Sequence, residues 1–179
     1  MGTSSVHLVT GIQAAGKSTV AQALAERLPG HTVHVHGDQF RRWIVGGRAE
    51  MTPDADPEAL RQLRLRYRLT AQTCDTYADA GFSVVAQDVV LGPELPALIA
   101  EIRTRPLHVV VLAPRPGAVA AREAGRAKRA YGPAWSVEAL DEVLRSGTPR
   151  VGLWLDTSEL SVAETVEEIL LRLDESRVA

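Results

Sequence analysis

The sequence predicts an α/β domain in which a five-stranded parallel sheet carries helices on both faces. Five short runs of apolar and β-branched residues alternate with segments whose apolar residues recur at helical spacing. This alternation is typical of parallel sheets, because each crossover between parallel strands contains a helix. With 179 residues, the chain is long enough for one domain with a substantial core and short for two. We therefore expect a three-layer sandwich that forms a single domain over residues 1–179.

Each element has its own local signal. The predicted strands are residues 5–10, 31–36, 82–87, 107–113 and 151–156. The predicted helices are residues 18–28, 58–80, 93–103, 136–145 and 161–173. Pro29-Gly30 ends the first helix, and Ser161-x-x-Glu164 opens the last one as a capping box. Residues 46–57 contain paired glycines and two prolines, so we expect a mobile loop there, near the site.

A phosphate-binding pattern directly follows the first predicted strand. Residues 11–19, Gly-Ile-Gln-Ala-Ala-Gly-Lys-Ser-Thr, satisfy G-x-x-x-x-G-K-[ST]. In such a loop the backbone N–H groups converge on the nucleotide phosphates, the lysine reaches the β- and γ-phosphates, and the hydroxyl holds Mg²⁺. The strand before it and the helix after it provide the required context, so the fold class is predicted as a P-loop NTPase. The predicted nucleotide-binding residues in this loop are Gly11, Ala14, Ala15, Gly16, Lys17, Ser18 and Thr19.

Two aspartates follow predicted strands at the edge where ligands bind in open parallel sheets. Asp38 follows the second strand and could accept a proton from a substrate hydroxyl, while Arg41 and Arg42 could hold an anionic group. Alternatively, Asp38 could simply cap the helix that starts there. Asp88 ends the third strand, and a carboxylate beside a phosphate loop favours Mg²⁺ coordination, directly or through water. The predicted metal-binding residues are therefore Ser18 and Asp88.

Basic residues form two groups along the chain. The first follows the fourth strand in a segment of about residues 115–133, which we interpret as a lid over the transferring phosphoryl group. Its candidate catalytic arginines Arg122, Arg126 and Arg129 can share one helical face, which is equally compatible with a solvated helix. The second group is interpreted as the solvated face of the helix 58–80. It consists of Arg61, Arg64, Arg66 and Arg68.

Composition restricts the classes of partner. A net charge of −2 provides no electrostatic case for nucleic acid or membrane binding. No apolar run approaches the length of a membrane span, and no signal-peptide pattern opens the chain. The single cysteine, Cys74, cannot form an internal disulfide, which fits a reducing compartment. We expect a soluble cytoplasmic protein, and no pattern indicates its oligomeric state.

The chain resembles small P-loop kinases, and the chloramphenicol phosphotransferase family above all. The similarity covers most of the chain and is best over residues 11–19, 84–92 and 116–123. In that family an aspartate after the second strand is the base toward a substrate hydroxyl, which implies this role for Asp38. The lid arginine of the family corresponds to Arg122 or Arg126. The strand-ending acidic pair of the family is half present, because Gln87 precedes Asp88.

Further segments resemble other members of the same group. The segment Gly-Asp-Gln-Phe-Arg-Arg is similar to one in adenylylsulfate kinases and in polynucleotide 5′-kinases. Residues 155–158 look like the adenine-side loop of the superfamily, which implies a nucleotide contact at Thr157. No match covers residues 46–80, where contacts specific to one antibiotic would lie, and this region belongs to the substrate-side segment of about residues 38–80.

Together these observations predict an ATP- and Mg²⁺-dependent kinase. Asp38 and Lys17 would be catalytic together with the lid arginines, and the acceptor would be a hydroxyl of a small molecule, with antibiotics among the candidates. One alternative is a kinase of polynucleotide 5′ ends, against which the acidic composition speaks. Another is a nucleotide-dependent regulator without transfer activity. The sequence leaves the identity of the acceptor open.

Overall fold

Six strands form one sheet in the computed structural model, which describes residues 4–54, 56–125 and 134–178. The strands are β1 Val6–Thr10, β2 Thr32–His36, β3 Ser83–Gln87, β4 Leu107–Leu112, β5 Leu153–Leu155 and β6 Arg177–Val178. The first five are parallel in the order β2-β3-β1-β4-β5, which confirms the predicted sheet. The short β6 was not predicted; it pairs antiparallel with the beginning of β4. Two residues are too few to produce a periodic pattern.

The strand β1 lies at the centre of the sheet although it comes first in the chain. Val6 is opposite Val84 of β3 on one side and Leu107 of β4 on the other. All residues of β1 and β4 are buried, so their apolar runs are continuous rather than alternating. This register brings the carboxyl ends of β1, β2 and β3 to the same edge of the sheet, where the residues predicted to be functional follow.

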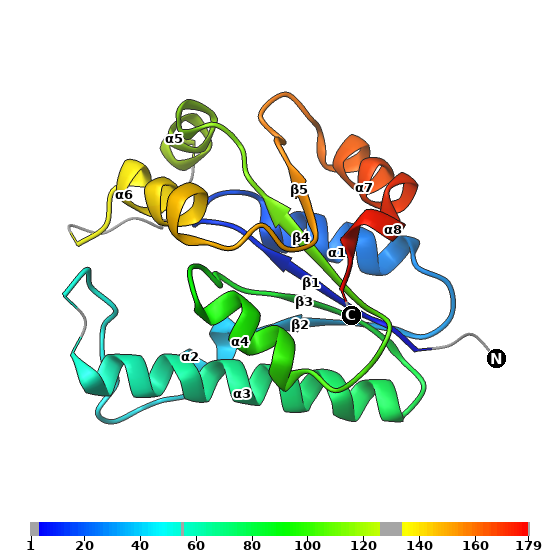
Figure 1. Cartoon of the computed structure of the whole chain (residues 1–179), viewed down its shortest axis with the longest axis horizontal. Helices are drawn as coiled ribbons and strands as arrows, with labels where there is room; N and C mark the ends of the chain where they lie inside the picture. Colours follow the sequence, from blue (N-terminus) through cyan, green and yellow to red (C-terminus); the bar gives the residue numbers. More distant parts are fainter. Residues whose placement is uncertain (1–3, 55, 126–133, 179) are drawn as a thin grey trace.

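Helices cover both faces of the sheet, as predicted (Figure 1). The helices are α1 Lys17–Arg27, α2 Asp38–Arg42, α3 Pro57–Asp79, α4 Glu94–Glu101, α5 Pro116–Ala124, α6 Val137–Glu142, α7 Val162–Leu171 and α8 Leu173–Ser176. Helices α1 and α7 pack together against one face, and α3 with α4 covers the other. In the described ranges, no helix combines the length and the apolarity that crossing a bilayer would require.

Local side-chain chemistry explains several helix ends. The predicted capping box is confirmed: Ser161 accepts from the backbone of Glu164, whose carboxylate accepts from the backbone of Ser161. The helix predicted at 136–145 begins after Ser136, whose hydroxyl accepts from Ala139. Its last turn is instead a π-helix, Val143–Gly147, which sequence periodicity does not specify.

Two imidazoles are stacked inside the sheet. The ring centroids of His7 in β1 and His108 in β4 are 4.7 Å apart, and the two rings are nearly parallel. His7 is almost completely buried. His7 Nε2 lies 3.0 Å from Ser5 Oγ, and His108 Nδ1 lies 2.9 Å from Ser176 Oγ. Burial first, and then the charge of His108, lower the pKa of His7 to about 3. The fold therefore requires a neutral imidazole at this position.

Because the folded pKa of His7 lies below its unfolded value of 6.5, the unfolded chain takes up this proton first as pH falls. We expect the free energy of unfolding to fall from about pH 6.5 toward pH 3, by about 2 kcal/mol at pH 5 for this group. Denaturant titrations at pH 7 and pH 5 test this, with His7→Phe as a variant that keeps an aromatic ring but cannot titrate. If His7→Phe loses as much stability as the wild type over this interval, His7 is not the titrating group.

Candidate functional site

The phosphate loop between β1 and α1 is tightly curled. Gly11 has φ 149°, Ala14 φ 61° and Gly16 φ 94°, and Gly16 directly precedes the first residue of α1. A Cβ on Gly11 would lie 2.5 Å from the carbonyl oxygen of Leu112, so β4 forms the floor of the loop and permits no side chain there. The loop thus leads into the N-terminus of α1, whose first N–H groups and positive dipole end attract anions.

Lys17 is fixed over this loop. Its Nζ donates to the carbonyl of Ile12 at 2.7 Å, and the side chain is buried. The next two residues, Ser18 and Thr19, are exposed in the first turn of α1. The structure therefore brings together a cation, a helix N-terminus and an accessible hydroxyl, which is the arrangement that the sequence pattern predicts.

A cavity of about 290 Å³ adjoins the loop, and Arg122 of α5 forms one of its walls. Arg122 donates to the carbonyl of Ala15 in the loop at 3.3 Å and to the carbonyl of Thr157 at 2.6 Å. The Thr157 hydroxyl is buried and has no hydrogen-bond partner within the described residues. The cavity is lined by Ala15, Gly16, Thr19, Val20, Arg122, Thr157, Leu160, Ser161, Val162 and Thr165. Arg126 and Arg129, the other two candidate lid arginines, lie outside the described residues.

Asp38 is the first residue of α2, at the end of β2. Gly37 occupies the N-cap position and α2 has no side-chain cap, so the alternative interpretation of Asp38 as a helix cap is wrong. The Asp38 carboxylate pairs with Arg42 at 2.6 Å and remains partly exposed. Arg41 pairs with Glu50, also at 2.6 Å. Both arginines that we expected to hold an anionic group are therefore neutralised by carboxylates of the chain itself.

Asp88 forms a buried ion pair with Arg66 of α3. Arg66 Nε donates to Oδ2 at 2.7 Å and Nη2 donates to Oδ1, while the backbone N–H of Val89 also donates to Oδ1. The side chains of Asp88 and Arg66 are 1% and 13% exposed. Burial of the guanidinium opposes its charge, but the carboxylate of Asp88, with a smaller contribution from Asp38, raises the pKa of Arg66 overall. Arg66 is therefore charged, and it lies within electrostatic reach of both aspartates.

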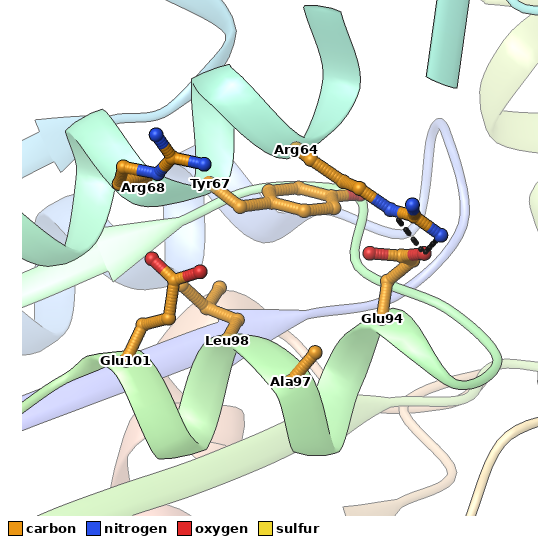
Figure 2. Close-up of a pocket in the computed structure, with 7 residues that line it drawn as sticks. All are labelled: Arg64, Tyr67, Arg68, Glu94, Ala97, Leu98 and Glu101. Atoms are coloured by element: carbon orange, nitrogen blue, oxygen red, sulfur yellow. Dashed lines mark hydrogen bonds and ion pairs between the residues drawn. The ribbon is translucent and has the colours of Figure 1, made fainter. Parts of the chain in front are cut away.

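The prediction that Arg66 lies on a solvated face is wrong, whereas its neighbours on α3 are exposed as predicted. Arg61 pairs with Glu58, and Arg64, 65% exposed, pairs with Glu94 of α4 at 3.3 Å. Figure 2 shows this second pair at the rim of a small cavity of about 130 Å³ between α3 and α4. A signal for Arg66 existed: it lies three residues after Leu63 and directly before Tyr67, at the edge of the apolar stripe.

The loop after α2 is held by specific contacts rather than lying unattached. Gln62 of α3 donates to the carbonyl of Gly47 at 2.8 Å and accepts from the N–H of Ala49 at 2.9 Å. The indole of Trp135 donates to the carbonyl of Met51 at 3.0 Å. Trp43 is 70% exposed and meets only the edge of the Phe40 ring among aromatic side chains of the described residues. Trp43 directly follows α2, so an exposed aromatic ring lies at the end of the helix that carries Asp38.

The residues fit a nucleotide better than they fit a preformed metal centre. Among the described residues, no group of three or more His, Cys, Asp or Glu side chains could hold a metal ion. Ser18 is accessible beside the anion-binding helix end, whereas both oxygens of Asp88 already accept hydrogen bonds. A metal ion would therefore depend on Ser18 and on phosphate oxygens brought by the nucleotide.

The sheet order, the curled glycine loop and the lysine over it define a P-loop nucleotide-binding fold of the kinase type. A family model described as "AAA domain" matches residues 6–150, and the chain belongs to this family. A search of curated proteins by sequence finds no match. The resemblance to chloramphenicol phosphotransferases stays a prediction, because the family match reaches only the broader group.

Several solved structures have the same fold. A sugar kinase from Janibacter sp. HTCC2649 superposes with a TM-score of 0.69 at 19% identity, covering 98% of this chain and 96% of that one. The tunicamycin resistance protein of Deinococcus radiodurans superposes with a TM-score of 0.68 at 19% identity, covering 98% of this chain and 99% of that one. The APS kinase of Mycobacterium tuberculosis, in complex with AMPPNP and APS, superposes with a TM-score of 0.68 at 14% identity, covering 97% of this chain and 99% of that one. At these identities, the likeness shows the fold.

Proposed function

We propose that this protein is an ATP-dependent kinase that transfers the γ-phosphoryl group to a hydroxyl of a small molecule. The observation that carries the proposal is the placement of two unlike groups at one edge of the sheet. The phosphate loop with Lys17 follows β1, and the partly exposed carboxylate of Asp38 follows β2. Anion binding at the first and proton acceptance at the second are the two functions that phosphoryl transfer to an alcohol requires.

Each residue has a definite role in this proposal. The backbone of residues 11–19 binds the α- and β-phosphates, and Lys17 neutralises the β- and γ-phosphates. Asp38 orients the acceptor hydroxyl and accepts its proton. The acceptor oxygen then bonds to the γ-phosphorus while the bond to the β–γ bridging oxygen breaks, and ADP leaves. Mg²⁺, held by Ser18 and the phosphates, would supply further charge neutralisation when bound.

Arg122 and Thr157 serve the donor nucleotide in this proposal, away from the phosphates. Arg122 connects the phosphate loop to residue 157 across a cavity large enough for part of a nucleoside. The buried Thr157 hydroxyl, which lacks a partner within the described residues, is a further polar group in this wall. This assignment moves Arg122 from the lid role implied by the resemblance to a nucleoside-side role.

Replacing Arg122 by Met should therefore weaken nucleotide binding, because two carbonyl contacts that fix the cavity wall are lost. We expect the Kd for Mg²⁺–AMPPNP, measured by calorimetry, to rise about tenfold, equivalent to about 1.4 kcal/mol. Arg115→Met is the matched control, since Arg115 lies just before the same helix but is exposed and pairs with Glu159. Equal affinities for Arg122→Met and the wild type would exclude this role.

The acceptor is proposed to be a small molecule without a strong anionic anchor. Three arginines of α2 and α3 are matched by carboxylates: Arg42 by Asp38 itself, Arg41 by Glu50 and Arg66 by Asp88. The same pairing speaks against polynucleotide ends, whose phosphates require unmatched cations. Names of proteins with this fold, a sugar kinase and a tunicamycin resistance protein, support sugars and tunicamycin as the first compounds to test.

A screen for acceptor-dependent ADP release tests the proposed function. Neutral polyols, sugars and hydroxyl-bearing antibiotics are compared with acidic sugars and with a 5′-hydroxyl oligonucleotide, each at saturating Mg²⁺–ATP. We expect stimulation over the slow hydrolysis by water with a neutral compound, and a phosphorylated product by mass spectrometry. Nucleotide binding without stimulation by any class would favour a regulator, and stimulation by the oligonucleotide alone would favour the polynucleotide alternative.

A further inference from the structure

We infer that Arg66 and Asp88 are positioning residues for Asp38, and that Asp88 does not anchor the metal. The inference rests on the proposed function, because it assigns how the acceptor-side base is held. It concerns one buried contact chain that runs from α3, through the carboxylate of Asp88, to the turn between β2 and α2.

The first step is the direction in which Asp88 points. The preceding residue, Gln87, lies opposite His36 in the sheet, and its amide is 3.2 Å from His36 Nδ1. The rings of His36 and His34 are in tilted contact, with their centroids 3.9 Å apart, and His34 Nδ1 is 2.9 Å from Gln22 Oε1 of α1, so these side chains lie on the α1 face. Asp88 instead meets Arg66 of α3, which covers the opposite face. The carboxylate is thus directed away from the helix that carries Ser18.

The second step is the contact between Asp88 and Gly37. A Cβ placed on Gly37 would lie 2.2 Å from Asp88 Oδ2 and 2.8 Å from its Cγ, so the backbone of the turn rests directly on the carboxylate. Gly37 has an ordinary right-handed helical conformation, which means that space rather than backbone freedom requires glycine here. The N–H of Gly37 also donates to the carbonyl of Gln87 at 3.0 Å. Asp38 is the next residue.

Donors from α3 fix the carboxylate of Asp88. Arg66 donates two hydrogen bonds to the carboxylate of Asp88, and the hydroxyl of the neighbouring Tyr67 donates to the carbonyl of Val89 at 2.7 Å. Two successive residues of α3 therefore hold the segment after β3, while Asp88 supports the turn after β2. A bidentate guanidinium–carboxylate pair is geometrically specific, so it transmits the position of α3 to Asp38. A lysine could not form this bidentate pair, because its ammonium group does not present two parallel N–H donors in a plane.

The experiment compares Arg66→Met, Asp88→Asn and the double variant Arg66→Met/Asp88→Leu with the matched control Arg64→Met. Arg64 lies on the same helix but forms an exposed pair (Figure 2). Three quantities are measured: hydrogen exchange of peptides covering residues 37–43 and 11–19, Mn²⁺ affinity in the presence of AMPPNP by electron paramagnetic resonance, and kcat and KM for acceptor-dependent ADP release.

In Arg66→Met and Asp88→Asn, we expect faster hydrogen exchange in residues 37–43 and unchanged exchange in residues 11–19. Mn²⁺ affinity should stay at the wild-type value. The kcat should fall by about 100-fold while the KM for ATP is unchanged. The double variant should regain thermal stability relative to the single variants, because no buried charge is left unpaired, but its kcat should stay low. Arg64→Met should match the wild type throughout. Arg66→Lys should fall between Arg66→Met and the wild type.

Two results would overturn the inference. Weaker Mn²⁺ binding in Asp88→Asn, with unchanged exchange in residues 37–43, would make Asp88 a metal anchor. Recovery of kcat together with stability in the double variant would show that the pair contributes only to folding. If the wild-type protein phosphorylates no acceptor, the proposed function fails, but the exchange and Mn²⁺ measurements still decide whether Asp88 supports the turn or the metal.

Discussion

Replacing Asp38 by Asn should reduce the single-turnover rate of phosphoryl transfer by about 10²- to 10⁴-fold, the range that general bases contribute. The amide keeps the size of the carboxylate but cannot accept the proton of the acceptor hydroxyl. Nucleotide affinity should stay at the wild-type value, because Asp38 follows β2, two strands away from β1, which leads into the phosphate loop. Rapid-quench measurements with the acceptor found in the screen would show the effect.

The control for Asp38→Asn is Glu50→Gln, which removes a carboxylate from the same side of the molecule. Glu50 pairs with Arg41 of α2 but is well exposed. We expect near-normal transfer from this variant, because exposed ion pairs contribute at most about 1 kcal/mol to stability. Transfer by Asp38→Asn at the rate of Glu50→Gln would remove Asp38 from the role of base.

Replacing Lys17 by Met should have the other large effect, on the donor side. The ammonium group is held 2.7 Å from the carbonyl of Ile12 and is buried, so its charge acts in a poorly solvated environment. We expect the transfer rate to fall by about 10²- to 10³-fold, the loss that follows removal of one preorganised donor from a transition-state oxyanion. Affinity for Mg²⁺–AMPPNP should fall as well.

Calorimetry and single-turnover kinetics separate the two effects of Lys17→Met. Arg27→Met is the control: it removes a positive charge from the last turn of the same helix, where the residue is exposed. Lys17→Arg should not restore transfer, because a branched guanidinium does not fit a position shaped for a single ammonium group. Wild-type transfer by Lys17→Met would contradict both the donor-site assignment and the proposed function.

The parts of this protein that the sequence predicts are those encoded locally. The phosphate loop is one continuous segment, and its strand and helix context is read from neighbouring residues. The capping box of Ser161 and Glu164 spans four residues, so it too was predictable. The central strands β1 and β4 follow from apolar runs that are buried on both faces.

What sequence reasoning missed depends on residues far apart in the chain. Arg66 and Asp88 are separated by 22 positions, and only the packing of α3 against the sheet brings them together. From the sequence alone, a basic residue beside an apolar stripe is interpreted as solvated, because the carboxylate that pairs with it in the fold cannot be identified. The π-helix at Val143–Gly147 is adjacent to a similar long-range contact, since Thr148 accepts from the N–H of Gly92 and donates to the carbonyl of Val143. Such contacts have no periodic signature.

The central position of β1 determines when the phosphate loop can reach its final shape as the chain is synthesised. Residues 11–19 are synthesised before their supports, which are β3 from residue 83, the Leu112 carbonyl under Gly11, and the Thr157 carbonyl joined to Ala15 through Arg122. Contacts of such large sequence separation form slowly. A nascent chain that ends before residue 112 therefore contains the complete phosphate-binding motif without the floor on which it curls, and we expect nucleotide affinity to be acquired late in folding.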